Sequence, residues 1–247
     1  MIVREVEAKS ILSPSKVYDY AVNPYSGCQH ACSYCYARFM RRFTGHQEPW
    51  GEFVDVKMNA PDLLEVELRK KKPGKVWVSG VCDPYQPLER RYELTRRCLE
   101  MLSRSGWPVV VQTRSPLVVR DVDILSAAKD LEVGFTIPTA DDRIRRLFEP
   151  KAPPIEARLR ALDELHRAGI RTFAMIAPLL PGAEALADQL VGKVGHVLID
   201  RMNYNYGTWV YRKHGLQDKL GDDFFRPVAL ELAARFETAG IPCCIIL

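Results

Sequence analysis

The chain has 247 residues, of which 47% are apolar and 27% are charged, and its formal net charge is +4 at pH 7. These values are typical of a globular protein and exclude an intrinsically disordered chain or a fibrous repeat. The small excess of positive charge permits an acidic partner such as nucleic acid, but it does not by itself predict one.

A chain of this length fits one large domain, because α/β barrels commonly reach this size as a single unit, and we expect one domain over residues 1–247. The opening residues 1–10 lack the apolar core of a secretory signal, and no run approaches the roughly 18 apolar residues of a membrane span. We therefore expect a cytoplasmic protein with no membrane partner. Seven cysteines in a reducing compartment favour metal binding or catalysis over a disulfide framework.

Short apolar runs rich in Val and Ile recur along the chain. Runs without alternation are typical of parallel strands that are buried on both faces. We expect strands near residues 16–24 and within residues 75–80, 108–113, 131–137, 171–180, 196–200 and 243–247.

Amphipathic segments separate these runs. The segment 92–106 ends at Gly106 and has an apolar face formed by Leu94, Cys98, Leu99, Met101 and Leu102. The segment 155–169 repeats the pattern and ends at Gly169. A third helix is expected to begin with Pro227 in its first turn and to end at Gly240.

The expected order of elements is βαβα throughout, which implies right-handed crossovers and either an open doubly wound sheet or a barrel. About six or seven βα units fit the chain, fewer than the eight of a closed barrel. We therefore predict a partial (β/α)6 TIM-type barrel. The loops that follow its strands lie at the carboxyl ends, where barrel enzymes build their sites.

Three cysteines, Cys28, Cys32 and Cys35, lie within residues 23–38, with no fourth cysteine nearby. A four-iron cluster held by three thiolates keeps one iron free for another molecule. Zinc is the alternative, because Cys3His sites are common and His30 lies between the first two cysteines. Structural zinc usually takes its ligands from two separated knuckles, whereas these three thiols come from one segment. The spacing alone therefore favours the cluster and leaves zinc open.

The spacing of the three cysteines, with Tyr34 just before the third, resembles the signature of the radical S-adenosylmethionine (SAM) superfamily. The resemblance extends to the spore photoproduct lyase-like branch through residues 23–38, 83–100, 112–125, 136–158 and 177–182. In that superfamily three cysteines bind a [4Fe-4S] cluster, and the amine and carboxylate of SAM chelate the remaining iron. Reductive cleavage then yields methionine and a 5′-deoxyadenosyl radical. The branch is named after an enzyme that reverses a thymine dimer in spore DNA, but most of its members have no known substrate.

The resemblance also implies that residues at the strand ends hold SAM, and these are Tyr34, Ser79, Gly80, Asp83, Arg114 and Thr136. Asp83 or the carbonyl oxygens of Ser79 and Gly80 would accept hydrogen bonds from the amine. Arg114 would contact the carboxylate with its guanidinium fork. The structural alternatives are a plain Asp-Pro turn, a solvated arginine and a threonine that caps a strand.

Cys82 lies in the same loop, where a thiol could donate a hydrogen atom to a substrate radical. In the lyases of this branch the donor aligns two positions earlier, opposite Gly80, and this offset favours a packing or SAM-adjacent role for Cys82 over that of donor. The other cysteines, Cys98, Cys243 and Cys244, lie in apolar segments and are expected to be buried. Glu149 and Arg158 could pair with each other or reach the cofactor.

The resemblance implies a radical SAM enzyme with an external reductase, flavodoxin or ferredoxin as electron donor. Its substrate is not identified by the sequence; repair or modification of nucleic acid is the leading hypothesis, and radical modification of a small molecule or peptide is the second. A non-catalytic zinc or electron-transfer protein is the alternative of another class. Aromatic residues that could line a substrate mouth are Tyr25, Tyr36, Tyr85 and those of residues 203–209.

Overall fold

The computed structural model describes residues 1–246, and its largest feature is a sheet of eight strands in the order β11-β10-β9-β8-β7-β6-β3-β2. Neighbours from β3 to β11 are parallel, and β2 pairs with β3 in the antiparallel direction. Seven of these eight strands were predicted and are confirmed, and β2 is the one that was not predicted. The strands are β2 (Leu12–Pro14), β3 (Tyr20–Val22), β6 (Val76–Val78), β7 (Val109–Thr113), β8 (Leu131–Thr136), β9 (Arg171–Ile176), β10 (His196–Asp200) and β11 (Cys243–Ile246).

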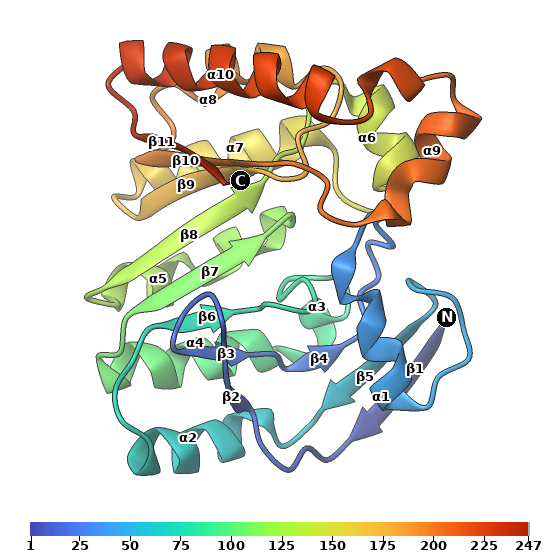
Figure 1. Ribbon diagram of the computed structural model, residues 1–247. Coiled ribbons are helices and arrows are strands. Elements are labelled where there is room, and N and C mark those ends of the chain that lie inside the picture. The colour runs from blue at the N-terminus through green and yellow to red at the C-terminus, as the bar shows by residue number, and fades with distance from the viewer. Residues whose placement is uncertain (247) are drawn as a thin grey trace.

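The sheet forms an open barrel. Each parallel strand from β3 to β10 is followed by at least one helix before the next strand of this sheet, and β11 ends the series. Within residues 1–246 the two edge strands, β11 and β2, do not pair with each other. Figure 1 shows the strands rising from β2 and β3 at the bottom to β10 and β11 at the top. The prediction of a partial (β/α)6 barrel is therefore confirmed.

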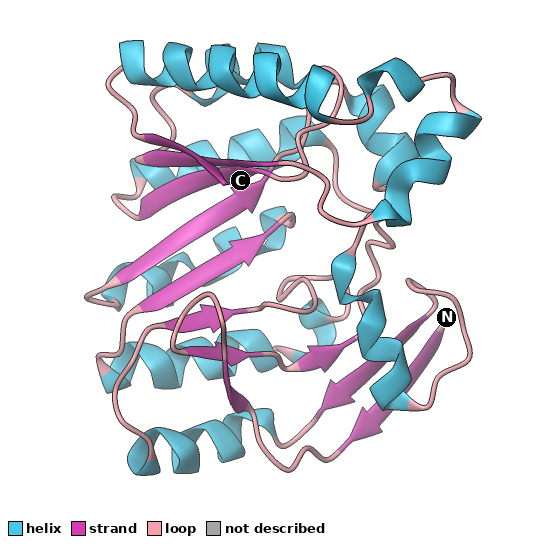
Figure 2. Cartoon of the chain, viewed as in Figure 1, coloured by secondary structure: helices cyan, strands magenta, loops and turns pink. Residues whose placement is uncertain are grey.

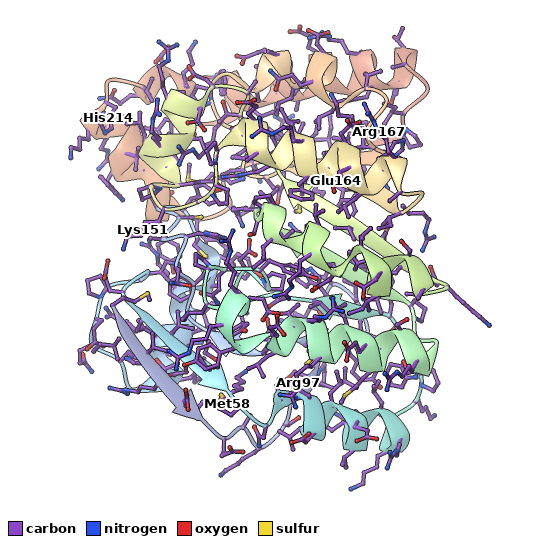
Figure 3. The ribbon with its side chains drawn as sticks, turned by 180° about the vertical axis from the view of Figure 1, so that it is seen from behind. Met58, Arg97, Lys151, Glu164, Arg167 and His214 are labelled. Carbon is purple, nitrogen blue, oxygen red and sulfur yellow. The ribbon has the colours of Figure 1, made fainter. Side chains whose placement is uncertain are left out.

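Helices cover the outer face of this sheet, as the helix and strand colours of Figure 2 show. Seen from behind, α4 and α7 lie outside the strands and carry the labelled Arg97, Glu164 and Arg167 (Figure 3). Apolar side chains between the helices and the sheet form the main core. The helices of four residues or more are α1 (Arg41–Thr44), α2 (Ala60–Lys70), α3 (Glu89–Tyr92), α4 (Leu94–Ser105), α5 (Val122–Ala127), α6 (Asp142–Phe148), α7 (Ile155–Arg167), α8 (Leu186–Leu190), α9 (Thr208–Lys213) and α10 (Asp222–Thr238), with 3-10 helices η1 (Tyr36–Met40) and η2 (Pro116–Asp121).

The structure confirms two of the predicted helices and corrects the start of the third. Both α4 and α7 bury the expected apolar face, and Gly106 and Gly169 follow them with φ of 72° and 78°. By contrast, α10 begins at Asp222, so Pro227 lies inside the helix instead of in its first turn. Asp222 and Asp223 provide the acidic first turn that favours a helix start.

A second, three-stranded sheet was not predicted. Its strands are β1 (Ile2–Val6), β5 (Phe53–Lys57) and β4 (Tyr25–Ser26), in the order β1-β5-β4. In Figure 1 it lies beside the lower strands of the main sheet, and α1 overlaps it in this view. Because β4 ends two residues before Cys28, this sheet anchors the start of the cysteine segment.

No helix within residues 1–246 is both long enough and apolar enough to cross a membrane.

Candidate active site

A pocket opens at the carboxyl ends of strands β6 to β10. Its walls come from the residues that end or follow these strands and from the cysteine segment between β4 and η1. The predicted cluster ligands, the predicted SAM-binding residues and Cys82 all lie in its lining, namely Cys28, Cys32, Tyr34, Cys35, Ser79, Gly80, Cys82, Asp83, Arg114 and Thr136. The structure therefore brings together residues that lie up to 108 positions apart in the sequence.

The cysteine segment is fixed by side chains from a neighbouring loop. The Gln86 side chain accepts a hydrogen bond from the Gln29 amide at 3.0 Å and donates one to the Gly27 carbonyl at 3.2 Å. In return, the Gln29 side chain accepts a hydrogen bond from the Leu88 amide at 2.7 Å. This reciprocal clamp holds an irregular segment in place without regular secondary structure.

Cys28, Cys32 and Cys35 are free thiols, and the first two are buried. Burial raises the pKa of all three, and it raises that of Cys32 to about 12. Uncompensated thiolates are therefore unfavourable here, and a bound cationic group would be needed to stabilise them. Within residues 1–246, no three Cys, His, Asp or Glu side chains converge on a single ion site. A cluster that bonds each thiolate through a different iron does not require such convergence.

His30 does not face this pocket. It is absent from the pocket lining, and its Nε2 lies 3.3 Å from Asp83 Oδ2. The His30 ring is therefore not placed as a fourth ligand beside the three thiols, as the Cys3His alternative required.

Asp83 is buried and its carboxylate is already occupied by the protein. It accepts hydrogen bonds from the Thr113 hydroxyl at 2.7 Å, the Arg114 amide at 2.8 Å and the Tyr85 amide at 2.9 Å. Burial alone would raise its pKa, but His30 and the hydrogen bonds from Thr113 and Arg114 lower it to about 2. Asp83 is thus a charged acceptor that fixes the loops after β6 and β7.

Glu149 is the centre of a second buried network. Its carboxylate accepts hydrogen bonds from Arg158 Nη2 at 2.5 Å, from Arg114 Nε at 2.8 Å and from the Tyr34 hydroxyl. Burial opposes ionisation, but the two guanidinium groups outweigh it and lower the pKa of Glu149 to about 2. Arg158 also donates to the Thr136 carbonyl at 2.9 Å. The expected pairing of Glu149 with Arg158 is confirmed, and it ties the cysteine segment to the ends of β7 and β8.

The loop after β6 carries Ser79, Gly80 and Cys82. The Ser79 hydroxyl donates to Asn23 Oδ1 at 2.6 Å and lies 2.9 Å from Cys82 Sγ. The Gly80 carbonyl accepts a hydrogen bond from the Tyr36 hydroxyl and has a second lone pair available. Burial raises the pKa of Cys82 to about 12, so this thiol keeps its proton at neutral pH.

Gln112 and Met175 are among the pocket residues that were not singled out from the sequence. Gln112 donates from Nε2 to the Thr136 hydroxyl at 3.2 Å and to Met175 Sδ at 2.8 Å. The signal for Gln112 was a polar residue that directly follows three valines in the run 108–113. A polar side chain on a strand otherwise buried on both faces indicates that one face lines a site.

The expectations for the remaining aromatic and cysteine residues hold in part. Tyr36 and Tyr204 line the pocket, as proposed for its mouth. Tyr25 and Tyr85 do not, because both are fully buried and donate their hydroxyl protons to Glu89 and Asp121. Cys98 is buried as expected, but Cys243 is only half-buried and Cys244 is exposed, because β11 is an edge strand.

Comparisons with known proteins agree with this arrangement. Residues 22–184 match the radical SAM superfamily. An uncharacterized protein of Methanocaldococcus jannaschii is 37% identical over 179 residues, which cover 72% of this chain and 67% of that protein. An uncharacterized protein of Mycobacterium tuberculosis is 33% identical over 189 residues, and there the chain matches only 55% of the relative's length.

Among solved structures, spore photoproduct lyase complexed with a dinucleoside spore photoproduct has the same fold. The TM-score is 0.73, the sequence identity is 14%, and the match covers 98% of this chain and 81% of the lyase. Together with the family match, this confirms the resemblance seen in the cysteine segment. The chain belongs to the radical SAM superfamily of enzymes and has the fold of spore photoproduct lyase.

Proposed function

We propose that the chain holds a [4Fe-4S] cluster through Cys28, Cys32 and Cys35 and uses it to cleave SAM reductively. The observation that carries this proposal is that the three thiols, two of them buried, open onto the same pocket as the strand-end residues expected to hold SAM. When bound, the cluster supplies one electron to SAM, whose carbon–sulfur bond breaks to give methionine and the 5′-deoxyadenosyl radical.

The residues around the pocket then have separate tasks. The carbonyl oxygens of Ser79 and Gly80 accept from the SAM amine, because the Asp83 carboxylate is already engaged by three donors of the protein. Asp83 is thus a positioning residue in this proposal. Arg114 is the cation for the SAM carboxylate, since it is held by Glu149 on one edge of its fork.

Tyr34 and Thr136 complete the SAM site. Tyr34 is fixed between Glu149 and Arg114, whose Nη2 lies 3.3 Å from its hydroxyl. Thr136 accepts from Gln112 and keeps its own proton to donate. We take residues 1–247 to act as one domain, because the small sheet and the main sheet both frame the cysteine segment. The electron would come from an external flavodoxin, ferredoxin or reductase.

We propose nucleic acid as the substrate class, for repair or modification. The solved lyase with the same fold was complexed with a dinucleoside, which supports this choice. Cys82 is the proposed hydrogen-atom donor, since it faces the pocket with its thiol protonated. Its S–H bond would break, the hydrogen atom would pass to a substrate carbon radical, and the unpaired electron would stay on sulfur.

The test is anaerobic reconstitution with iron and sulfide, followed by incubation with SAM and dithionite. We expect about four irons per chain, a visible charge-transfer band and release of 5′-deoxyadenosine without any substrate. Alanine at Cys28, Cys32 or Cys35 should abolish iron binding, whereas Cys243→Ala should retain it. Stoichiometric zinc without iron uptake, or intact SAM beside a loaded and reduced cluster, would show that the proposal is wrong.

A further inference from the structure

Five aromatic side chains form a continuous row beside the pocket, and we call this row the aromatic ladder. In spatial order its members are Phe43, Phe39, Tyr36, Tyr204 and Tyr206. Successive ring centroids lie 6.3, 6.4, 6.4 and 5.6 Å apart, and all but the first pair are stacked within 26° of parallel. Two segments more than 150 positions apart in sequence therefore build one stacked surface.

The ladder is exposed, although aromatic rings are usually buried. The exposed fractions run from 36% for Tyr206 to 66% for Phe43. A contiguous exposed apolar surface of this kind marks an interaction site, because isolated exposed rings would not be aligned. The ladder therefore offers an exposed aromatic surface to a partner.

Cations accompany the rings without anionic partners. The Arg38 guanidinium lies 4.7 Å from the Tyr206 ring centroid, and that of Arg42 lies 5.6 and 4.6 Å from Phe39 and Phe43. No acidic residue occurs in residues 36–44. Within the described chain, no salt bridge involves Arg38, Arg41, Arg42, Arg212 or Lys213. The surface thus combines stacking faces with unneutralised positive charge.

The ladder leads directly to the pocket. Tyr36 and Tyr204, its central rings, also line the pocket that holds the three cysteines. Figure 1 shows η1, α1 and α9 on the side toward which β7 and β8 point. A cavity of about 620 Å³, lined by Trp209, Arg212 and Lys219, adjoins the pocket through Arg201. A long ligand on the ladder would therefore pass over the reactive centre.

We propose that the aromatic ladder binds an unpaired strand of nucleic acid and presents one of its bases to the pocket. Bases of an unpaired strand stack on aromatic rings, and its phosphates meet the free arginines, whereas in a duplex the bases stack on one another. The delivery of a base rests on the proposed radical chemistry. The binding itself does not.

The test is fluorescence anisotropy with cluster-loaded protein, without SAM or reductant. The probes are a labelled single-stranded DNA of about 15 nucleotides, the same sequence as RNA, and its duplex. We expect one or both single strands to bind more tightly than the duplex. The comparison of the DNA strand with the RNA strand shows which sugar is preferred. Phe39→Ala and Phe43→Ala should each weaken binding by about fivefold or more, while Phe39→Tyr should retain it.

Charge variants separate the contribution of base stacking from that of the electrostatic attraction between arginines and phosphates. The double change Arg41→Gln and Arg42→Gln should lower the slope of log K against log salt by about 1.4, given roughly 0.7 per phosphate contact on a single strand. Arg104→Gln, an exposed arginine on α4, is the matched control and should change nothing. Tighter duplex binding, equal affinity of the alanine variants, or equal binding of a polyglutamate peptide would overturn the proposal. SAM cleavage is assayed without oligonucleotide, and oligonucleotide binding is assayed without SAM. Failure of the proposed SAM cleavage and failure of the proposed strand binding are therefore distinguishable.

Discussion

Replacing Glu149 by glutamine tests the buried network behind the cysteine segment. The side chains of Glu149 and Arg158 are both fully buried and 2.5 Å apart. Removing the negative charge leaves Arg158 charged in a fully buried site, which typically costs about 3–5 kcal/mol. Glutamine keeps an acceptor oxygen and Arg114 is partly exposed, so we expect the free energy of unfolding to fall by about 3 kcal/mol.

The Glu149→Gln variant should also change how the free energy of unfolding depends on pH, in a direction that follows from the pKa of Glu149. The pKa of Glu149 in the folded chain is about 2, below its ordinary value of 4.5. Because the folded-state pKa is the lower one, its stabilisation is complete above pH 4.5 and is lost as the pH falls toward 2. The difference in unfolding free energy between wild type and Glu149→Gln should therefore shrink as the pH falls below about 5.

Urea denaturation at several pH values measures both effects. Glu156→Gln is the matched control, because Glu156 pairs with Arg160 on the same helix, α7, with both side chains at least 68% exposed. Exposed pairs of this spacing contribute about 0.5 kcal/mol or less. A loss below about 1 kcal/mol for Glu149→Gln, or equal losses for the two variants, would refute the argument that burial makes this pair essential.

Two further changes test the interior. Gly134→Ala would place a Cβ 2.0 Å from Phe173 Cζ in the core, so it should cost about 1–3 kcal/mol in urea denaturation, whereas Gly195→Ala meets nothing closer than 3.4 Å and should cost little. Asp83→Asn should lower the unfolding free energy by roughly 2 kcal/mol, because a buried charged acceptor loses its charge. If Asp83 instead binds the SAM amine, the variant will retain stability and lose affinity for SAM in equilibrium dialysis.

The main sheet could be predicted because its strands are unbroken apolar runs. The three-stranded sheet could not, since β1 is exposed along most of its length and β4 has only two residues. Such short pairings are set by tertiary contacts and leave no period in the sequence. The start of α10 was predicted wrongly from Pro227. The preference of proline for the first turn of a helix is only a tendency, and here the acidic residues Asp222 and Asp223 outweigh it.

The candidate site was predictable where one segment carries the pattern. The spacing of Cys28, Cys32 and Cys35 indicated a metal or cluster site, and the resemblance to the radical SAM superfamily implied the residues after the strands. The contact of Tyr34 with Glu149 spans 115 positions, and no local pattern indicates it. The aromatic ladder was predictable only in part. The sequence does not show that Tyr204 stacks on Tyr36, and without that contact Phe39 and Phe43 are not recognisable as part of a longer aromatic row.

Cys82→Ala and Cys82→Ser test the proposed hydrogen-atom donor. Both variants lack the S–H bond, so on an oligonucleotide that the parent enzyme alters we expect the intended product to decrease and side products of the unquenched radical to appear. Iron content in the same samples checks the alternative that Cys82 is a cluster ligand, and Cys243→Ala is the thiol control. The thiol lies 2.9 Å from Ser79 Oγ and borders the apolar cluster around Tyr25, so a packing role predicts only a small loss of stability. A product profile from both variants that matches the parent enzyme would eliminate Cys82 as the donor.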